Sequence, residues 1–167
     1  MKNMRSNISA REARAGRGRL WRYGPLVVWM VVIFIASTGS LSASNTSRII
    51  RPLLLWLYPS ITEEGLMQAH FLVRKAAHLT EYAILALLAA RAFLTSSDAR
   101  LRRYWYAFAF ALVACYALFD EYHQSFVQTR TGTIYDSLID MTGGALALLL
   151  LTEWRAWRGN PKDGEKT

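Results

Sequence analysis

Four runs of apolar residues constrain this chain more than any other feature of its sequence. They cover Trp21–Ser40, Phe71–Leu94, Tyr104–Gln124 and Ile134–Trp154. Each run is close to the length of about 20 helical residues that crosses roughly 30 Å of hydrocarbon. Inside lipid, a helix satisfies its own backbone hydrogen bonds, whereas an open sheet leaves its edges unpaired. We therefore predict an all-α polytopic membrane protein with four transmembrane helices in one membrane domain, residues 21–154.

A shorter apolar segment lies between the first two runs. It centres on Pro52–Tyr58 and has about ten residues, too few to span a bilayer. We predict that it forms a short interfacial or re-entrant helix. The first run has a second interpretation, a cleaved signal peptide, because basic residues precede it and small residues follow it at 36–43. Its near-complete span length favours a retained transmembrane helix.

Basic residues are concentrated before the first run, between the second and third runs, and after the fourth run. They are Lys2, Arg5, Arg11, Arg14, Arg17, Arg19 and Arg22, then Arg100, Arg102 and Arg103, then Arg155, Arg158, Lys162 and Lys166. The positive-inside rule therefore places both termini and the loop 95–103 in the cytoplasm. We predict a flexible basic tail over residues 1–20 and a second cytoplasmic tail over residues 155–167. Because topology explains the net charge of +8, we expect no nucleic-acid partner.

Each of the last three runs carries ionisable residues near one end, and the predicted orientation brings those ends together at the outer leaflet. Ionisable side chains inside a membrane are costly, so they require either pairing or a function. They are Arg74, Lys75, His78 and Glu81 on the second run, Asp120, Glu121, His123, Gln124 and Arg130 on and after the third, and Asp136 and Asp140 on the fourth. This convergence predicts one polar pocket that faces outward.

Helical spacing predicts which residues of the second run share a face. Arg74, His78 and Glu81 follow one another at helical intervals and lie on one face. Lys75, His78 and Tyr82 form an adjoining stripe. His78 belongs to both, so the sequence does not decide which face turns toward the pocket.

A stripe of small residues continues the acidic face of the fourth run. Asp136 and Asp140 are followed on the same side by Gly143, Gly144 and Ala147. Small residues let a neighbouring transmembrane helix approach closely. We therefore predict that the two aspartates point toward the helix bundle and away from lipid.

The polar pocket has two main interpretations. In one, the charges form a buried ion-pair network that fixes how the helices associate. In the other, it is a binding or catalytic site, where basic groups hold a phosphate or carboxylate and a histidine beside a carboxylate moves protons. The candidates for proton transfer are His78, Glu81, Asp120, Glu121 and His123; the candidates for ligand binding are Arg74, Lys75, Gln124, Arg130, Asp136 and Asp140.

A metal site is a further interpretation. His78, Glu81, Glu121, His123 and Asp140 are all acceptable ligand types for zinc or manganese. Their spacings, His-x-x-Glu and Glu-x-His, are short and common, and the neighbouring lysine and arginines would compete with a metal ion. We therefore predict no metal and no cofactor.

The order and spacing of these motifs resemble the VanZ-like family of bacterial membrane proteins. The pattern, within residues 25–152, is Arg74-Lys75-x-x-His78-x-x-Glu81-Tyr82, then Asp120-Glu121-x-His123-Gln124-x-Phe126 through Arg130-x-Gly132, then Asp136-x-x-x-Asp140-x-x-Gly143. The resemblance implies a four-helix integral protein of the bacterial cytoplasmic membrane. Its eponymous member is associated with reduced susceptibility to the glycopeptide teicoplanin. The chain departs from the family at Gln128-Thr129, where relatives often have a proline–glycine turn.

The sequence is compatible with three functions. In the first, the chain is an envelope protein that reduces access or binding of a lipophilic glycopeptide, through contact with the antibiotic or a lipid-linked cell-wall precursor. Alternatively, it is an enzyme that modifies a lipid or lipid-linked precursor, or a structural protein whose charges hold the helices together. We favour the first, with membrane lipids as partners, and the sequence does not decide whether catalysis takes place.

Overall fold

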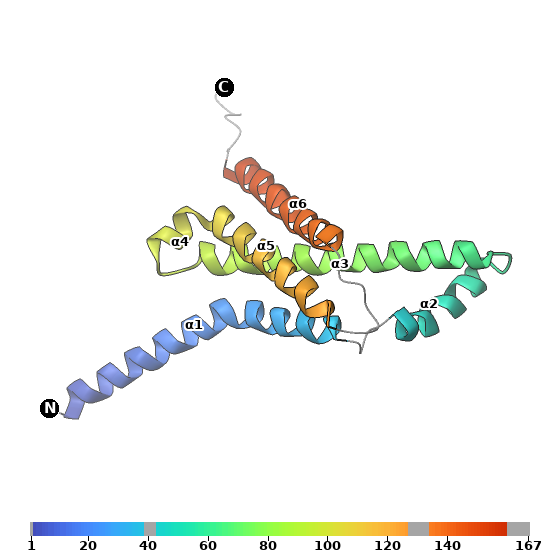
Figure 1. The fold of residues 1–167 in the computed structure, drawn as a ribbon. Coiled ribbons are helices and arrows are strands. Elements are labelled where there is room, and N and C mark those ends of the chain that lie inside the picture. Colours follow the sequence, from blue (N-terminus) through green and yellow to red (C-terminus); the bar gives the residue numbers. More distant parts are fainter. Residues whose placement is uncertain (1, 39–42, 127–133, 160–167) are drawn as a thin grey trace, which may run out of the picture.

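The computed structural model describes residues 2–38, 43–126 and 134–159, with side chains from residue 18 onward except those of 43–49. The helices, in order, are α1 (Lys2–Ser37), α2 (Ala43–Leu57), α3 (Glu63–Leu94), α4 (Ala99–Arg103), α5 (Trp105–Gln124) and α6 (Ile134–Gly159) (Figure 1). The prediction of an all-α fold is confirmed for the residues described.

The central helix of the bundle is α3, which packs against α6, α5 and α1. α5 and α6 also pack against each other. Figure 1 shows that α1 and α5 run toward the end of the bundle where α6 begins, while α3 and α6 run the opposite way. The first turns of α3 extend beyond the bundle, and α2 packs against α3.

Three of the described helices are long and apolar enough to cross a membrane. The candidate spans are Gly18–Ser37, Glu63–Leu94 and Ile134–Gly159. A multi-pass membrane protein is therefore confirmed by composition, but four spans are not. The predicted third span corresponds to α5, whose last turns contain Asp120 and Glu121 and lower its mean hydropathy.

Several helices extend further than we predicted, among them α3, α2 and α6, which ends at Gly159 and not at Trp154. α3 begins at Glu63, before the predicted start at Phe71, because the Thr62 hydroxyl caps it by accepting a hydrogen bond from the Gly65 backbone N–H at 3.2 Å. Acidic Glu63 and Glu64 in the first turn also favour a helix start there. The segment that we predicted as a short helix is α2, which begins at Ala43 and contains Pro52.

Two other expectations differ from the structure. Residues 2–20, which we predicted to be a flexible tail, continue α1 as helix. Their abundant alanine and arginine are strong helix formers, which explains the helix. The second concerns Cys115: its apolar neighbours in the sequence predict a buried thiol, but the residue is exposed on α5.

Small residues allow the helices to approach closely. On α3, Ala86, Ala89 and Ala90 are fully buried in the core. On α6, a Cβ atom added at Gly143 would lie 3.0 Å from the Cα and carbonyl carbon of Leu79 and closer still to its carbonyl oxygen. The predicted role of the small-residue stripe on α6 is therefore confirmed, since only glycine permits this contact between α6 and α3.

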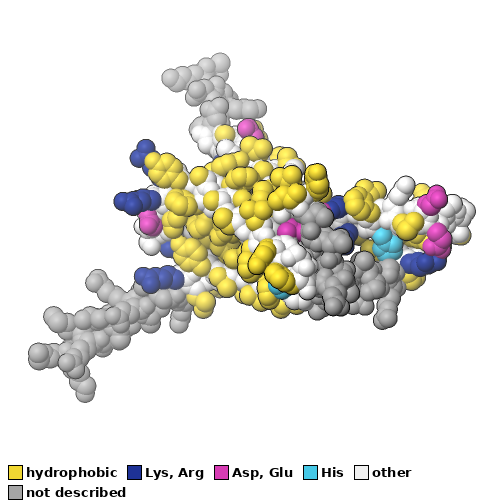
Figure 2. Space-filling view, in the orientation of Figure 1, with side chains coloured by type: hydrophobic (Ala, Val, Ile, Leu, Met, Phe, Trp, Pro, Cys, Tyr) yellow, Lys and Arg dark blue, Asp and Glu magenta, His cyan; other side chains and the backbone are white. Residues whose placement is uncertain are grey.

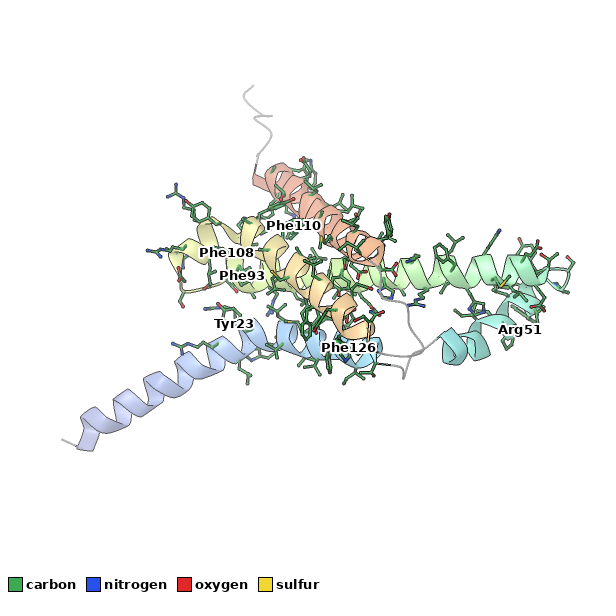
Figure 3. The ribbon with its side chains drawn as sticks, viewed as in Figure 1. Tyr23, Arg51, Phe93, Phe108, Phe110 and Phe126 are labelled. Atoms are coloured by element: carbon green, nitrogen blue, oxygen red, sulfur yellow. The ribbon has the colours of Figure 1, made fainter. Side chains whose placement is uncertain are left out.

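The surface is divided into a hydrophobic belt and two polar ends. Figure 2 shows hydrophobic side chains across the middle of the molecule and Lys and Arg side chains gathered at the edge where α4 lies. We call this edge the arginine end. There, Phe93 and Phe108 contact each other edge to face with ring centroids 6.2 Å apart (Figure 3). At the opposite side, Arg51 of α2 pairs with Glu63 of α3 at 2.5 Å.

Candidate functional site

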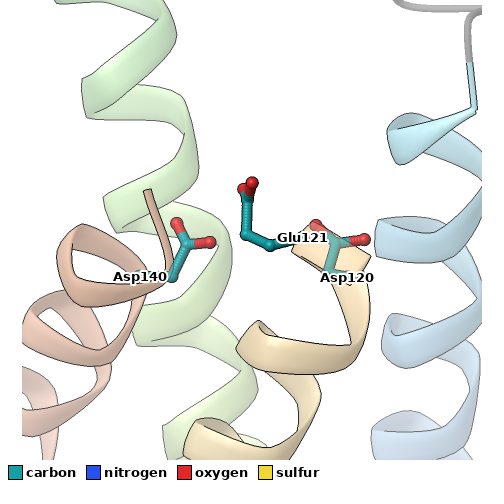
Figure 4. Close-up of side chains that lie close together, drawn as sticks. All are labelled: Asp120, Glu121 and Asp140. Atoms are coloured by element: carbon teal, nitrogen blue, oxygen red, sulfur yellow. The ribbon is translucent and has the colours of Figure 1, made fainter. Parts of the chain in front are cut away.

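Three buried carboxylates meet where α5 ends and α6 begins. Asp120 and Glu121 belong to the end of α5, and Asp140 belongs to α6. Their exposed fractions are 2%, 7% and 0%. One carboxylate oxygen from each lies within 4.8 Å of the others. We call these three residues the carboxylate cluster, and Figure 4 shows Glu121 between the other two.

The α3 stripe of Lys75, His78 and Tyr82 faces this region. Lys75 Nζ donates a hydrogen bond to Asp136 Oδ1 of α6 and forms an ion pair with it. One turn later, His78 Nδ1 lies 3.4 Å from Asp140 Oδ1. Tyr82 is fully buried. Of the two faces that the sequence allowed, the structure therefore turns this stripe toward α6.

α1 closes the other side of the cluster. Gln124 donates through Nε2 to Asp120 Oδ2 at 2.9 Å within α5. The neighbouring His123 ring stacks on Phe34 of α1, with centroids 4.6 Å apart. The Tyr116 hydroxyl donates to the Met30 carbonyl oxygen at 2.5 Å. α5 is thus attached to α1 by an aromatic contact and a hydrogen bond on the side away from α6.

Several buried polar atoms at this site have no hydrogen-bond partner among the described residues. They include the Tyr82 hydroxyl and both carboxylate oxygens of Asp140. A buried polar group left unsatisfied costs about 1–3 kcal/mol, so such groups require an explanation. Close buried carboxylates also repel each other unless protons or cations offset their charge. The arrangement therefore suits a site that receives an additional group.

The structure brings most of the predicted residues together. Those at or beside the carboxylate cluster are Lys75, His78, Asp120, Glu121, His123, Gln124, Asp136 and Asp140. Arg74 is half-buried on α3, next to the stripe. Glu81 is also half-buried, and its backbone carbonyl accepts a hydrogen bond from Trp29 Nε1 at 2.9 Å. Arg130 lies outside the described residues.

Sequence reasoning missed some residues that shape the site. Tyr82 was placed in the stripe but not among the site residues, although its spacing from His78 carried that signal. Trp29 and Phe34 are apolar residues of a uniformly apolar helix, so no pattern marked them as neighbours of polar groups. Only their packing against α3 and α5 reveals the role.

Comparison with known proteins adds one finding. The VanZ/LLP1 family model matches residues 23–155, a range that contains the complete carboxylate cluster. No curated protein and no solved structure matches the chain. Because the family match covers most of the 167 residues, the chain belongs to the VanZ/LLP1 family.

Proposed function

We propose that α5 also crosses the membrane, as the third of four transmembrane helices in chain order, and that the carboxylate cluster lies at the outer leaflet. α5 has 20 residues, which is enough to span, and it packs against the candidate spans α3 and α6. Its acidic residues are turned into the bundle. Phe108, Phe110 and Phe119 on its surface are exposed, as lipid-facing residues would be. α5 begins directly after α4, which carries the arginines of the arginine end, and its last turns contain Asp120 and Glu121 of the carboxylate cluster.

The orientation follows from the positive-inside rule. The short helix α4 carries Arg100, Arg102 and Arg103, which favours the cytoplasm for the arginine end. The carboxylate cluster lies toward the other end of the long helices, so it faces outward. Both termini are then cytoplasmic.

Within this orientation, we propose that the protein binds a lipophilic anionic ligand and so contributes to tolerance of teicoplanin-type glycopeptides. The ligand is the acylated antibiotic or a lipid-linked cell-wall precursor. An acyl chain partitions into apolar surroundings, so such a ligand is concentrated at the membrane. Membership of the VanZ/LLP1 family supports this class of function.

The observation that carries the proposal is a cation beside an apolar groove on α3. The groove has a volume of about 420 Å³ and is lined by Met67, Gln68, Phe71 and Leu72. Lys75 Nζ lies 5.2 Å from the centre of the Phe71 ring. The groove suits an acyl chain, while Lys75, which also pairs with Asp136, and the neighbouring Arg74 suit a phosphate or carboxylate.

A susceptibility assay tests this function. A sensitive Gram-positive host expresses the wild type, Lys75→Gln or the control Arg103→Gln at matched membrane abundance. We expect protection against teicoplanin, but not against vancomycin, which lacks the acyl chain. Lys75→Gln should lose protection and Arg103→Gln, exposed at the arginine end, should keep it. Equal protection against both drugs, or none, would contradict the proposal.

A second candidate function is an enzyme that modifies a lipid-linked envelope precursor. The contact between His78 and Asp140 favours it, because a carboxylate can orient a histidine that acts as general acid or base. His123 with Asp120 is the alternative pair on α5. Mass spectrometry of lipid extracts from cells with wild type, His78→Gln or no protein tests this candidate. Identical lipid masses in all three would exclude it.

A further inference from the structure

We infer that Asp120, Glu121 and Asp140 bind one divalent metal ion of the oxygen-binding class, Mg²⁺, Mn²⁺ or Ca²⁺. This inference goes beyond the proposed function, because it concerns the buried carboxylate cluster and not the groove beside Lys75. It also differs from the metal site that the sequence suggested, since only Glu121 and Asp140 belong to both sets.

The distances fit such an ion after small side-chain rotations. One oxygen from each carboxylate lies within 4.8 Å of the other two. Oxygen ligands lie about 2.0–2.6 Å from these ions, so two ligands on opposite sides of the ion are separated by about 4–5 Å. Figure 4 shows Glu121 between Asp120 of the same helix, α5, and Asp140 of α6. Carboxylate oxygens are the ligands that these ions prefer.

The negative charge of the three carboxylates is better offset by a divalent ion than by His78 alone. Three ionised carboxylates that are at least nine-tenths buried repel one another in a medium of low dielectric constant. His78 contacts Asp140 and supplies at most one positive charge. Lys75 pairs with Asp136, which is outside the cluster, so the lysine does not occupy the space between the three carboxylates. Asp140 is fully buried and neither of its carboxylate oxygens has a hydrogen-bond partner among the described residues, so a divalent ion bound there would offset its charge.

A second, independent observation points to a bound group. Tyr82 is fully buried on α3, and its hydroxyl has no hydrogen-bond partner among the described residues. This hydroxyl is within electrostatic range of Asp120, Glu121 and Asp140. Metal ions of this class keep water molecules as ligands. A metal-bound water near the cluster would provide the missing partner for Tyr82.

Purified protein in detergent tests the inference, with Mn²⁺ as the probe. The full chain is treated with EDTA, loaded with Mn²⁺ and desalted. We expect one tightly bound Mn²⁺ per chain by elemental analysis and electron paramagnetic resonance, and a melting temperature that falls on EDTA treatment and recovers with Mn²⁺. Loss of even an outer-shell partner weakens metal binding about 10- to 100-fold, so Asp140→Asn and Glu121→Gln should lower the affinity at least as much.

A control and a stability comparison keep the test interpretable. Glu153→Gln removes an exposed acid from the same helix as Asp140 and should retain the metal. In EDTA, Asp140→Asn should melt no lower than the wild type, because it removes one charge from a repelling cluster. Wild type without bound Mn²⁺ and with a melting temperature insensitive to EDTA would overturn the inference. These measurements involve no antibiotic, so their failure is separate from failure of the glycopeptide proposal.

Discussion

The two ends of the bundle differ in how well their polar groups are hydrogen-bonded. At the arginine end, polar side chains are matched with partners: the Tyr23 hydroxyl lies 3.1 Å from Ser96 Oγ, and Arg102 donates to the Ser96 carbonyl oxygen at 2.6 Å. At the carboxylate cluster, side chains are more deeply buried, and Tyr82 and Asp140 include atoms without hydrogen-bond partners among the described residues. The arginine end therefore shows matched polar groups, whereas the cluster shows the unsatisfied buried atoms for which we propose a bound group.

The contrast also has a structural origin in α6. Gly143 and Gly144 follow Asp140 within about one helical turn and bring α6 against α3 and α5. This contact holds the carboxylates of α5 and α6 close together despite their repulsion. Free energy from helix packing therefore offsets the electrostatic cost of the cluster, which leads to three predictions about the comparison.

The largest expected effect comes from Gly143→Ala. The new methyl group would collide with the backbone of Leu79, which cannot rotate away, so α6 must move off α3. We expect a loss of about 3 kcal/mol of stability, the upper part of the range for overpacking. Thermal unfolding in detergent measures it.

Two other glycine variants serve as references. Gly144→Ala should cost less than Gly143→Ala, because its nearest atom, 2.7 Å away, is the Val113 methyl group Cγ1, on a side chain that can adjust. Gly159→Ala meets nothing within 4 Å and should be neutral. Equal stability of all three variants would show that α6 does not cross α3 at Gly143.

The next effect separates a structural network from a functional site. If the cluster only holds helices together, Glu121→Gln should cost about 3–5 kcal/mol and reduce the amount of folded protein. We expect instead near-normal abundance with loss of Mn²⁺ binding, because the change removes one of three neighbouring negative charges. Membrane abundance and metal content, measured on the same preparation, test this. A large fall in abundance would favour the structural interpretation.

Much of this site could be predicted because helical spacing is regular. The sequence placed Lys75, His78 and Tyr82 on one stripe and predicted that Asp136 and Asp140 point into the bundle, as the structure has them. It could not choose between the two stripes of α3. That choice depends on where α6 crosses α3, which is set by contacts of Gly143 with the backbone of another helix.

Other features of the site could not be predicted from local sequence patterns, for a related reason. Which carboxylates approach each other depends on the relative rotation of α5 and α6, and spacing along one helix contains no such information. The same holds for α1, whose apolar residues surround the helix evenly, so Trp29 gave no sign that it donates to Glu81. The acidic residues of α5 had the opposite effect, since they mark the site but lower the hydropathy by which a span is recognised.

The smallest expected effect comes from the same substitution, tyrosine to phenylalanine, made at each end of the bundle. Tyr23→Phe removes a hydroxyl that has a partner, and we expect it to destabilise the protein by about 1 kcal/mol. Tyr82→Phe removes a fully buried hydroxyl without a partner among the described residues, so in EDTA we expect a neutral or stabilising effect of about 1 kcal/mol. In EDTA, Tyr23→Phe should therefore lower the melting temperature, while Tyr82→Phe should leave it unchanged or raise it.

Adding Mn²⁺ makes the comparison of these two variants more informative. If a metal-bound water is the partner of Tyr82, the gain from Tyr82→Phe should shrink or reverse when the metal is present, while the loss from Tyr23→Phe should not change. Equal destabilisation by both substitutions in EDTA would mean that the Tyr82 hydroxyl has a permanent partner in the folded protein. The two ends would then differ in burial but not in how well their polar groups are satisfied, and the case for a bound group at the cluster would rest on the carboxylates alone.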